Sequence, residues 1–353
     1  MLSHSQEPEE PMAPVVYSAA ESLRTSASLN DALTSVDGSP EGSRFCLTVP
    51  TYPSHTDQNG FANAGFVLEL MDVGGCIPAK RHVGFNYHIV TACQDRTDFL
   101  HPVRPWDILN VEAQLTRVWG RSMESRVCVW VWSFETGQKR VIANAYQVNV
   151  VLDKNLQKAN PDDIPPLLSQ TEKDVREAEA ADRRRQYRQQ EDAQAIRIPF
   201  TAEDQPLVRN RILTPADANT IHHAFGGILL AEMHQAAWDV AQAHASSGCS
   251  MLCVRQERTN FLKPAPIGSI LVSRAQVVKS WNTSIDVQVD LDAFCPQTQQ
   301  VIPVASSLLV FVQTNQQGIP TPVTPWVPQT HSQERRAELA VIRRQLREQE
   351  QGH

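Results

Sequence analysis

The chain has 353 residues, of which 41% are hydrophobic, and its 32 Lys and Arg against 39 Asp and Glu give a net charge of −7. At roughly 150 residues per domain this length predicts two domains, and the acidic balance gives no electrostatic footprint for nucleic acid or for an anionic membrane surface. The seven cysteines contain no Cys-x-x-Cys pair and are odd in number, which argues against both a zinc ribbon and a disulfide framework.

Residues 1–43 are rich in Ser, Pro, Glu and Gly, which predicts a flexible N-terminal arm. This segment has neither the apolar run of a secretory signal nor the basic, acid-poor character of a transit peptide. No stretch of the chain approaches the ~20 apolar residues that span a bilayer. We therefore expect a cytoplasmic protein, with a mitochondrial location as the alternative.

Residues 44–153 read as a first unit that begins with one long helix and continues with strands. Apolar residues at helical spacing predict a nearly apolar helix over residues 65–82, which Pro78 should kink or end. Strand-like runs follow. They cover residues 89–99, 108–119, 125–134 and 141–151.

Residues 154–195 read as a linker, in which a proline-rich opening precedes a highly charged, Arg-rich run that predicts a solvated helix bridging the units. Residues 196–313 repeat the pattern of the first unit. The predicted elements are a helix over residues 227–244 and strands over residues 251–261, 269–281, 285–291 and 301–312. Residues 314–353 hold a Pro-rich segment and a charged surface helix. One helix followed by antiparallel strands predicts an α+β unit whose sheet wraps the helix.

The two units align without a gap at one constant offset, the one that carries Met71 onto Met233. In the same frame the segment TDFLHP at 97–102 falls on TNFLKP at 259–264, and Trp119 falls on Trp281. Because so many identical or similar residues align at one offset, the sequence indicates that one unit was duplicated. Positions where the two copies differ are therefore the place to look for chemistry.

Six short segments carry a resemblance to a known family: LELMD at 68–72, VTA at 90–92, DFLHP at 98–102, SME at 122–124, FGGIL at 225–229 and AAW at 236–238. In their order and duplication they resemble the tandem-hotdog acyl-CoA thioesterases, and most closely the mitochondrial branch of the mammalian family. The resemblance implies two hotdog domains in tandem, acyl-CoA as the substrate, and neither a metal nor a further cofactor. It also implies a homo-oligomer, in the form of a trimer of double-hotdog chains.

In that family an acidic residue on the helix of one unit works with a polar residue just ahead of the helix in the other unit. Here the acid is Asp72, and its counterpart in the second unit is His234. Just ahead of the helix the polar residue is in the second unit instead. There His223, beside His222, corresponds to the apolar Phe61 of the first unit. The resemblance thus implies one active centre, in which His222 or His223 holds the water or donates to the thioester carbonyl.

A carboxylate inside an apolar helix loses hydration, which raises its pKa toward that of a general base. Asp72 could activate water or attack the carbonyl directly, and the sequence does not separate the two. The oxyanion can be met by free N–H groups where the second helix begins, at Phe225, Gly226 and Gly227, with Gly65 as the counterpart in the first unit.

Further candidates lie around this centre. Asn219 is either a polar member of the site or a turn and capping residue. Arg117, Arg121, Lys263 and Lys279 are near predicted strand ends and are candidates for binding the phosphates of CoA.

Two other functions stay open. The segment 217–222 resembles the signature of hotdog enoyl-CoA hydratases, which would use Asp217 and His222 to add water to a double bond, although Thr220 stands where those enzymes have Pro. A non-catalytic acyl-CoA-binding protein is the third possibility, because one of the two potential sites lacks its acid.

Overall fold

The computed structural model describes residues 38–57, 60–194 and 196–351, which lie within one compact unit, Val36–His353. Residues 1–37, most of the predicted arm, lie outside the described residues. The end of the predicted arm instead forms a short helix, α2 (Pro40–Ser43), in which the buried Ser43 hydroxyl accepts a hydrogen bond of 2.9 Å from the Leu115 N–H. The predicted domain boundaries stay predictions.

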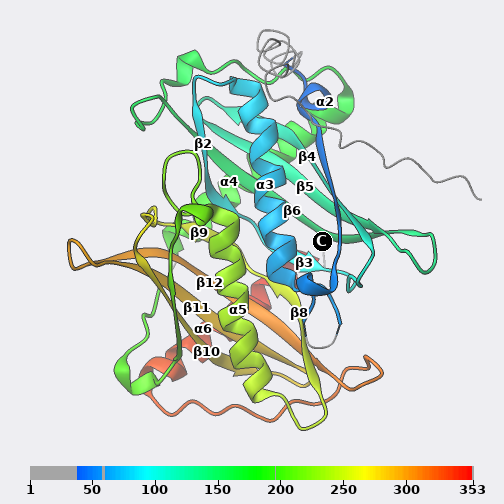
Figure 1. The fold of residues 1–353 in the computed structure, drawn as a ribbon, viewed down its shortest axis with the longest axis vertical. Coiled ribbons are helices and arrows are strands. Elements are labelled where there is room, and N and C mark those ends of the chain that lie inside the picture. Colours follow the sequence, from blue (N-terminus) through cyan, green and yellow to red (C-terminus); the bar gives the residue numbers. More distant parts are fainter. Residues whose placement is uncertain (1–37, 58–59, 195, 352–353) are drawn as a thin grey trace, which may run out of the picture. The chain divides into compact units, whose positions relative to one another are not determined.

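In the first half one long helix is followed by strands, as predicted, and an unpredicted strand precedes that helix (Figure 1). Its elements are α2, β1 (Phe45–Pro50), η2 (Pro53–His55), α3 (Ala64–Val83), β2 (His88–Gln94), β3 (Thr97–Phe99), β4 (Ile108–Trp119), β5 (Ser122–Trp132) and β6 (Lys139–Leu152). A short turn η3 (Pro161–Asp163) and the helix α4 (Glu172–Gln194) connect it to the second half.

The second half repeats these elements in the frame found in the sequence, because the offset that carries Met71 onto Met233 also carries the first residue of β1 onto that of β7, and the first residue of α3 onto that of α5. Its elements are η4 (Ala202–Asp204), β7 (Leu207–Ile212), η5 (Pro215–Asp217), α5 (Gly226–His244), β8 (Ser250–Gln256), β9 (Thr259–Phe261), β10 (Ile270–Ser280), β11 (Ser284–Cys295), β12 (Gln300–Thr314) and α6 (His331–Gln351).

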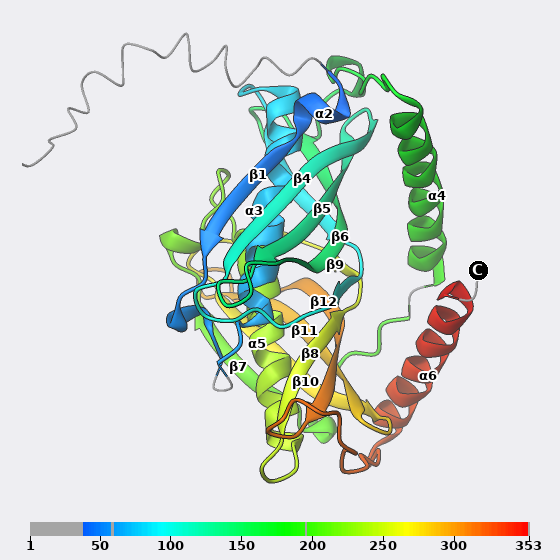
Figure 2. The same cartoon turned by 90° about the vertical axis from the view of Figure 1, so that its right-hand side faces the viewer.

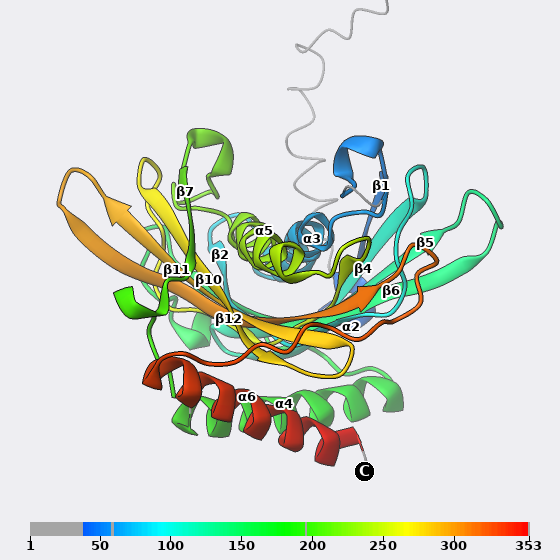
Figure 3. The ribbon, with the colours of Figure 1, turned by 90° about the horizontal axis from the view of Figure 1, so that it is seen from below.

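The twelve strands in the described part of the chain form one antiparallel sheet, whose main path runs β1-β4-β5-β6-β2-β9-β12-β11-β10-β7. The halves join where β2 pairs with β9, through Gln94 and Thr259, and where β3 pairs with β8, through Thr97 and Gln256. In the repeat, Gln94 corresponds to Gln256 and Thr97 corresponds to Thr259, so each of the two pairings is the counterpart of the other. The contact between the halves is therefore two-fold symmetric. Helices α3 and α5 lie side by side on one face of the sheet, and α4 and α6 lie on the other (Figures 2 and 3).

The structure differs from the predicted elements in three places. Strands β1 and β7 were not predicted, because they are edge strands of only six residues in which every second residue is exposed. The runs 89–99 and 251–261 each break into two strands. Pro78 does not end α3, which continues to Val83. After the proline, Ala79 is buried in the core and the His82 ring hydrogen-bonds with the Pro165 carbonyl at 2.8 Å, so tertiary contacts hold the last turn of the helix. No described helix is apolar over a length that could cross a membrane.

Helices α3 and α5 approach closely because each has a glycine at the same repeat position. A Cβ atom on Gly65 would lie 3.2 Å from the Cα of Ala231, and one on Gly227 would lie 2.8 Å from the backbone oxygen of Glu69. In both cases the atom it would meet is helix backbone, which cannot move aside cheaply. The glycines thus let the start of each helix reach the middle of the other.

The two halves do not have the same core. In the second half one continuous cluster of buried apolar residues surrounds α5, whereas in the first half the core is divided into two clusters along α3. Buried polar side chains, among them Ser125, Gln147 and Asn149, lie in the first half. Their repeat counterparts are Val287, Leu309 and Phe311, all of them buried in the apolar core.

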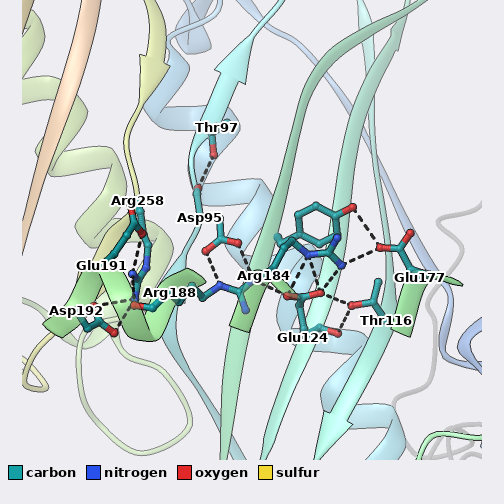
Figure 4. Close-up of polar contacts among 11 residues, drawn as sticks. Asp95, Thr97, Thr116, Glu124, Glu177, Arg184, Arg188, Glu191, Asp192 and Arg258 are labelled. Carbon is teal, nitrogen blue, oxygen red and sulfur yellow. Dashed lines mark hydrogen bonds and ion pairs between the residues drawn. The ribbon is translucent and has the colours of Figure 1, made fainter. Parts of the chain in front are cut away.

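The predicted linker helix α4 is joined to the sheet by ion pairs, and it is therefore less solvated than predicted (Figure 4). Arg188 is 6% exposed and pairs with Asp95, at 2.6 Å, and with Glu124. Glu124 is fully buried and also accepts a hydrogen bond of 2.7 Å from Arg184. Near its end α4 contacts the second half, because Arg258 pairs with Glu191 and Asp192. The helix therefore bridges the halves beside the β2–β9 joint.

Glu124→Gln should lower the free energy of unfolding by about 1.5–3 kcal/mol, since two guanidinium groups lose a charged acceptor while Asp95 still pairs with Arg188. Chemical denaturation of the full chain measures the change. Glu172→Gln is the matched control, because the Glu172 side chain is 94% exposed and its ion pair with Arg176 is a surface pair. Equal stability of the two variants would contradict a structural role for the buried pairs.

Candidate active site

Asp72 lies in the middle of α3 and is fully buried, yet its carboxylate has three hydrogen-bond donors. Thr91 of β2 donates to Oδ1 at 2.6 Å, and Gln147 of β6 donates to the same oxygen at 3.0 Å. The Gly227 N–H at the start of α5 donates to Oδ2 at 2.7 Å. The carboxylate of one half is therefore held by a backbone group of the other.

Burial raises the pKa of Asp72 to about 6, while the hydrogen bonds from Thr91 and Gly227 act in the opposite direction. A carboxyl group with such a pKa is mostly ionised at pH 7 but takes up a proton far more readily than an exposed aspartate. Asp72 is thus suited to accept and return a proton near neutral pH.

The start of α5 has no side-chain cap, so its N–H groups are available to other acceptors. They are not all free. Phe225 donates to the Asp217 carbonyl at 2.9 Å, and Gly227 donates to Asp72. Among the hydrogen bonds of the described residues, none uses the Gly226 N–H. The prediction of three free N–H groups is corrected to one, at Gly226.

The turn ahead of α5 is organised by Asn219. Its side-chain oxygen accepts from the N–H groups of Ile221, at 3.0 Å, and His223, at 3.1 Å. His222 is exposed with a φ of 58°, and burial lowers the pKa of His223, whose Nδ1 is buried without a partner. Asn219 thus has the structural role that the sequence left open.

The turn reaches the first half, because the Thr220 hydroxyl lies 3.3 Å from His88 Nδ1, on the strand that carries Thr91. The described hydrogen bonds do not join Asp72 to either turn histidine. The structure therefore brings the start of α5 to Asp72, and participation of His222 or His223 stays a prediction.

Asp217, the acid of the hydratase alternative, is occupied by local contacts. It is 3% exposed, accepts hydrogen bonds from the Thr214 N–H at 2.7 Å and the Thr214 hydroxyl at 2.9 Å, and pairs with Arg211. This carboxylate caps the turn η5 and is not free to exchange a proton with a substrate.

The four candidate CoA-binding residues do not form one group. Arg117 pairs with Asp182 of α4 at 3.1 Å, and the amine of Lys279 lies over the ring of Trp281. Arg121 is exposed in the turn between β4 and β5. Lys263 is exposed in the loop 262–266, which hydrogen-bonds with the backbone just ahead of α5. Of the four, Lys263 therefore has contacts that place its loop at the start of α5.

The second potential site, formed by His234 of α5 and the start of α3, differs from the Asp72 site. His234 replaces Asp72 and is buried, and burial lowers its pKa to about 3. The Gly65 N–H donates to the side chain of Asn63 at 2.8 Å, so the predicted role of Gly65 in meeting an oxyanion is wrong. Ala64 stands where the other half has Gly226. A cavity of about 360 Å³ lies here, lined by His234, Ala64 and Phe61 among others.

The partners of Asp72 were missed in the sequence analysis, although the repeat contains a signal for them. Thr91 corresponds to Cys253 and Gln147 corresponds to Leu309. Polar residues that replace apolar ones at inward strand positions in the copy that keeps the acid indicate a site around that acid.

A profile of the thioesterase superfamily matches residues 59–131 in the first half and residues 222–293 in the second. One segment in each half of the chain is thus similar to the thioesterase superfamily. Each matched segment extends from the turn ahead of the long helix into the second long strand after it. The matched segments contain Asp72 in one copy and the start of α5 in the other.

Two relatives extend the match. The chain is 27% identical over 259 residues to the acetyl-coenzyme A thioesterase of Rattus norvegicus. That alignment covers 69% of this chain and 45% of the rat protein. It is 24% identical over 327 residues to the cytosolic acyl coenzyme A thioester hydrolase of Mus musculus. That alignment covers 87% of this chain and 85% of the mouse protein. The chain therefore spans about half the length of the rat relative.

A solved structure supports the fold. The acyl-ACP thioesterase of Bacteroides thetaiotaomicron matches with a TM-score of 0.50 at 15% identity, over 77% of this chain and 99% of that chain. The fold is two hotdog units in tandem, as predicted.

Gly226→Ala should lower the free energy of unfolding by about 1–3 kcal/mol, because its Cβ would lie 2.9 Å from Asp72 Oδ2 and would displace the carboxylate from Gly227. Helix propensity alone predicts the opposite sign, a gain of about 0.5–1 kcal/mol. Chemical denaturation at pH 7 decides between them. A variant more stable than the wild type would show that the carboxylate has room to move.

Proposed function

We propose that this chain hydrolyses acyl-CoA thioesters to a free acid and CoA, at the position of Asp72. The observation that carries the proposal is a fully buried carboxylate with a raised pKa, held at the uncapped start of a helix from the other half. The names of the rat and mouse relatives support the same substrate class.

In the general-base route, the Asp72 carboxylate removes a proton from water as the water oxygen attacks the thioester carbonyl. The resulting oxyanion faces the Gly226 N–H, where the positive end of the α5 dipole favours negative charge. The carbon–sulfur bond then breaks, and the thiolate takes up the proton that Asp72 holds. Thr91 and Gln147 fix the orientation of the carboxylate throughout.

In the nucleophilic route, Asp72 attacks the carbonyl itself, releases the thiolate and forms a mixed anhydride that water then cleaves. Both routes require the ionised carboxylate and the same oxyanion donor. The turn histidines His222 and His223 would hold the water or the carbonyl, and Lys263 would contact the phosphates of CoA.

The two other functions receive less support. The hydratase reading needs Asp217, which caps its own turn and pairs with Arg211. A binding protein without turnover has no need for a buried carboxylate whose pKa lies near neutrality. A cytoplasmic location and a trimer of double-hotdog chains stay predictions.

Asp72→Asn should reduce kcat/KM for thiol release from acyl-CoA by about 10²–10⁴-fold, since the amide can neither take a proton from water nor attack the carbonyl. A chromogenic thiol reagent follows the reaction over CoA esters of several chain lengths. Asp239→Asn is the matched control, because Asp239 lies on α5 and pairs with Arg209. If both variants hydrolyse acyl-CoA at similar rates, the site assignment fails. Loss of enoyl absorbance without thiol release would support the hydratase.

The pH dependence of kcat/KM should show a rise through pH about 6 to a plateau, because the pKa of Asp72 is about 6 and the ionised form is the active one. Below that pH the carboxyl is protonated and the rate falls tenfold per pH unit. The residual activity of Asp72→Asn should lack this limb. A wild-type rate that is flat between pH 5 and pH 7 contradicts the role of Asp72 as the titrating group.

A further inference from the structure

The loop after β6 lies next to the turn ahead of α5. The Thr220 hydroxyl of that turn lies 3.3 Å from His88 Nδ1 on β2. His88 pairs with Leu152 at the end of β6, and Leu152 in turn forms a bridge with Lys158. Since neighbouring strands lie about 4.8 Å apart, these contacts form a short, continuous path from the turn to Lys158. The loop 153–158 is therefore at the rim of the Asp72 site.

Asp153 holds this loop in a defined shape. Its side-chain oxygen accepts hydrogen bonds from the N–H groups two and four residues further on, at 2.8 Å and 2.9 Å. Asn315 does the same in the second half, at 2.9 Å and 3.0 Å. Leu156 and its counterpart Gly318 both have a positive φ, of 60° and 76°. The loops 153–158 and 315–320 are therefore counterparts with the same backbone shape.

The second potential site shows where the residues of these loops lie. Its cavity of about 360 Å³ is lined by Pro320, which follows β12, and by His101, which follows β3. In the repeat Lys158 corresponds to Pro320, and Lys263 corresponds to His101. The two halves have equivalent elements and meet at a two-fold symmetric contact. Lys158 and Lys263 therefore occupy the same places around the Asp72 site.

The rim of the Asp72 site has lysines that the rim of the second potential site lacks. Lys154, Lys158 and Lys263 are exposed, and none of the ion pairs among the described residues uses them. The carboxylate of their loop neighbour Asp153 is occupied by backbone N–H groups. No Lys or Arg lines the cavity of the second potential site. The residues that correspond to the three lysines are Gln316, Pro320 and His101. An anion is therefore attracted to one rim and not to the other.

Phosphate is the anion that this arrangement fits. In an acyl-CoA the pantetheine arm separates the thioester from the diphosphate and from the 3′-phosphate of the nucleotide. A thioester carbonyl bound between Asp72 and the Gly226 N–H therefore leaves the phosphates outside the buried site, at its rim. Lysine ammonium groups bind phosphate oxygens through charge-assisted hydrogen bonds, and two separate loops supply them here.

We propose that Lys158 and Lys263, together with Lys154, bind the phosphate groups of CoA, and that each chain binds one CoA. The second potential site, which lacks these lysines, binds none. The identity of the ligand rests on the proposed function. The lysines add selectivity, because a CoA ester is bound in preference to a thioester that has no phosphates.

Calorimetric titration of the full chain with CoA tests the lysines directly, because CoA is not consumed. We expect one CoA per chain, with an affinity that falls as the salt concentration rises. Lys158→Ala and Lys263→Ala should each weaken CoA binding about tenfold, because a charge-assisted hydrogen bond is lost. Lys158→Arg should keep most of the affinity. Lys173→Ala is the matched control, since it removes the same charge from an exposed position of α4, on the opposite face of the sheet (Figure 3).

Steady-state kinetics give a second measurement. We compare kcat/KM for a CoA ester with kcat/KM for the N-acetylcysteamine ester of the same acid, which has no phosphate. The ratio of the two should fall about tenfold in Lys158→Ala, through KM, and should not fall in Lys173→Ala. A chain that binds CoA through these lysines but releases no thiol would refute the proposed hydrolysis and leave the phosphate site in place. The phosphate site itself is refuted if CoA does not bind, if two CoA bind per chain, or if Lys158→Ala and Lys173→Ala bind CoA equally well.

Discussion

The hydrogen bond between the Gly227 N–H and the Asp72 carboxylate is the contact that brings the buried acid of one half to the helix start of the other. An ionised carboxylate away from water is costly unless donors replace its hydration. A helix start supplies such a donor together with the favourable end of a dipole. The donor reaches Asp72 only because Gly226 and Gly227 lack side chains and α5 can therefore lie against α3. Close packing of the helices and ionisation of Asp72 thus depend on each other.

This requirement explains why the two copies have diverged in their interiors. Around Asp72 the strands present Thr91, Gln147 and Asn149, and these polar groups divide the apolar core of the first half. Around His234 the corresponding positions are apolar and the core is continuous. A satisfied polar network specifies one geometry, but it contributes less burial of apolar surface than the residues it replaces. The second half, free of the carboxylate, provides the larger continuous core.

The sequence analysis predicted the elements whose pattern is long and regular, and it missed those whose pattern is short. The helices and strands such as β4 and β12 follow from periodicity. Strands β1 and β7 expose every second residue at the sheet edge, so hydrophobicity marks them weakly. Asp72 was identified from the sequence because packing alone does not favour a charged residue inside an apolar helix. The side chains that donate hydrogen bonds to it were not identified, because strand register decides which polar residues face the helix.

The same limit applies to the backbone groups of the site. A sequence shows that Gly226 and Gly227 permit close approach, but it does not show which N–H is already used. That depends on how far α3 lies from α5, which both halves determine together. Asn63 illustrates the point, since it caps α3 and removes the Gly65 donor that the repeat predicted to be equivalent. Equivalent positions in a duplicated chain have equivalent backbones, and side chains at the helix starts decide which of them can meet a ligand.

Both potential sites involve one helix. Helix α5 begins at Gly226, beside the carboxylate, and carries His234 and Trp238 further along, beside the cavity. A shift of α5 along its axis would change the distance from Gly227 to Asp72 and the volume of the cavity together, because a packed helix moves as a unit. On the opposite face of the sheet the outer helix α4 ties β5 of the first half to Arg258 of the second.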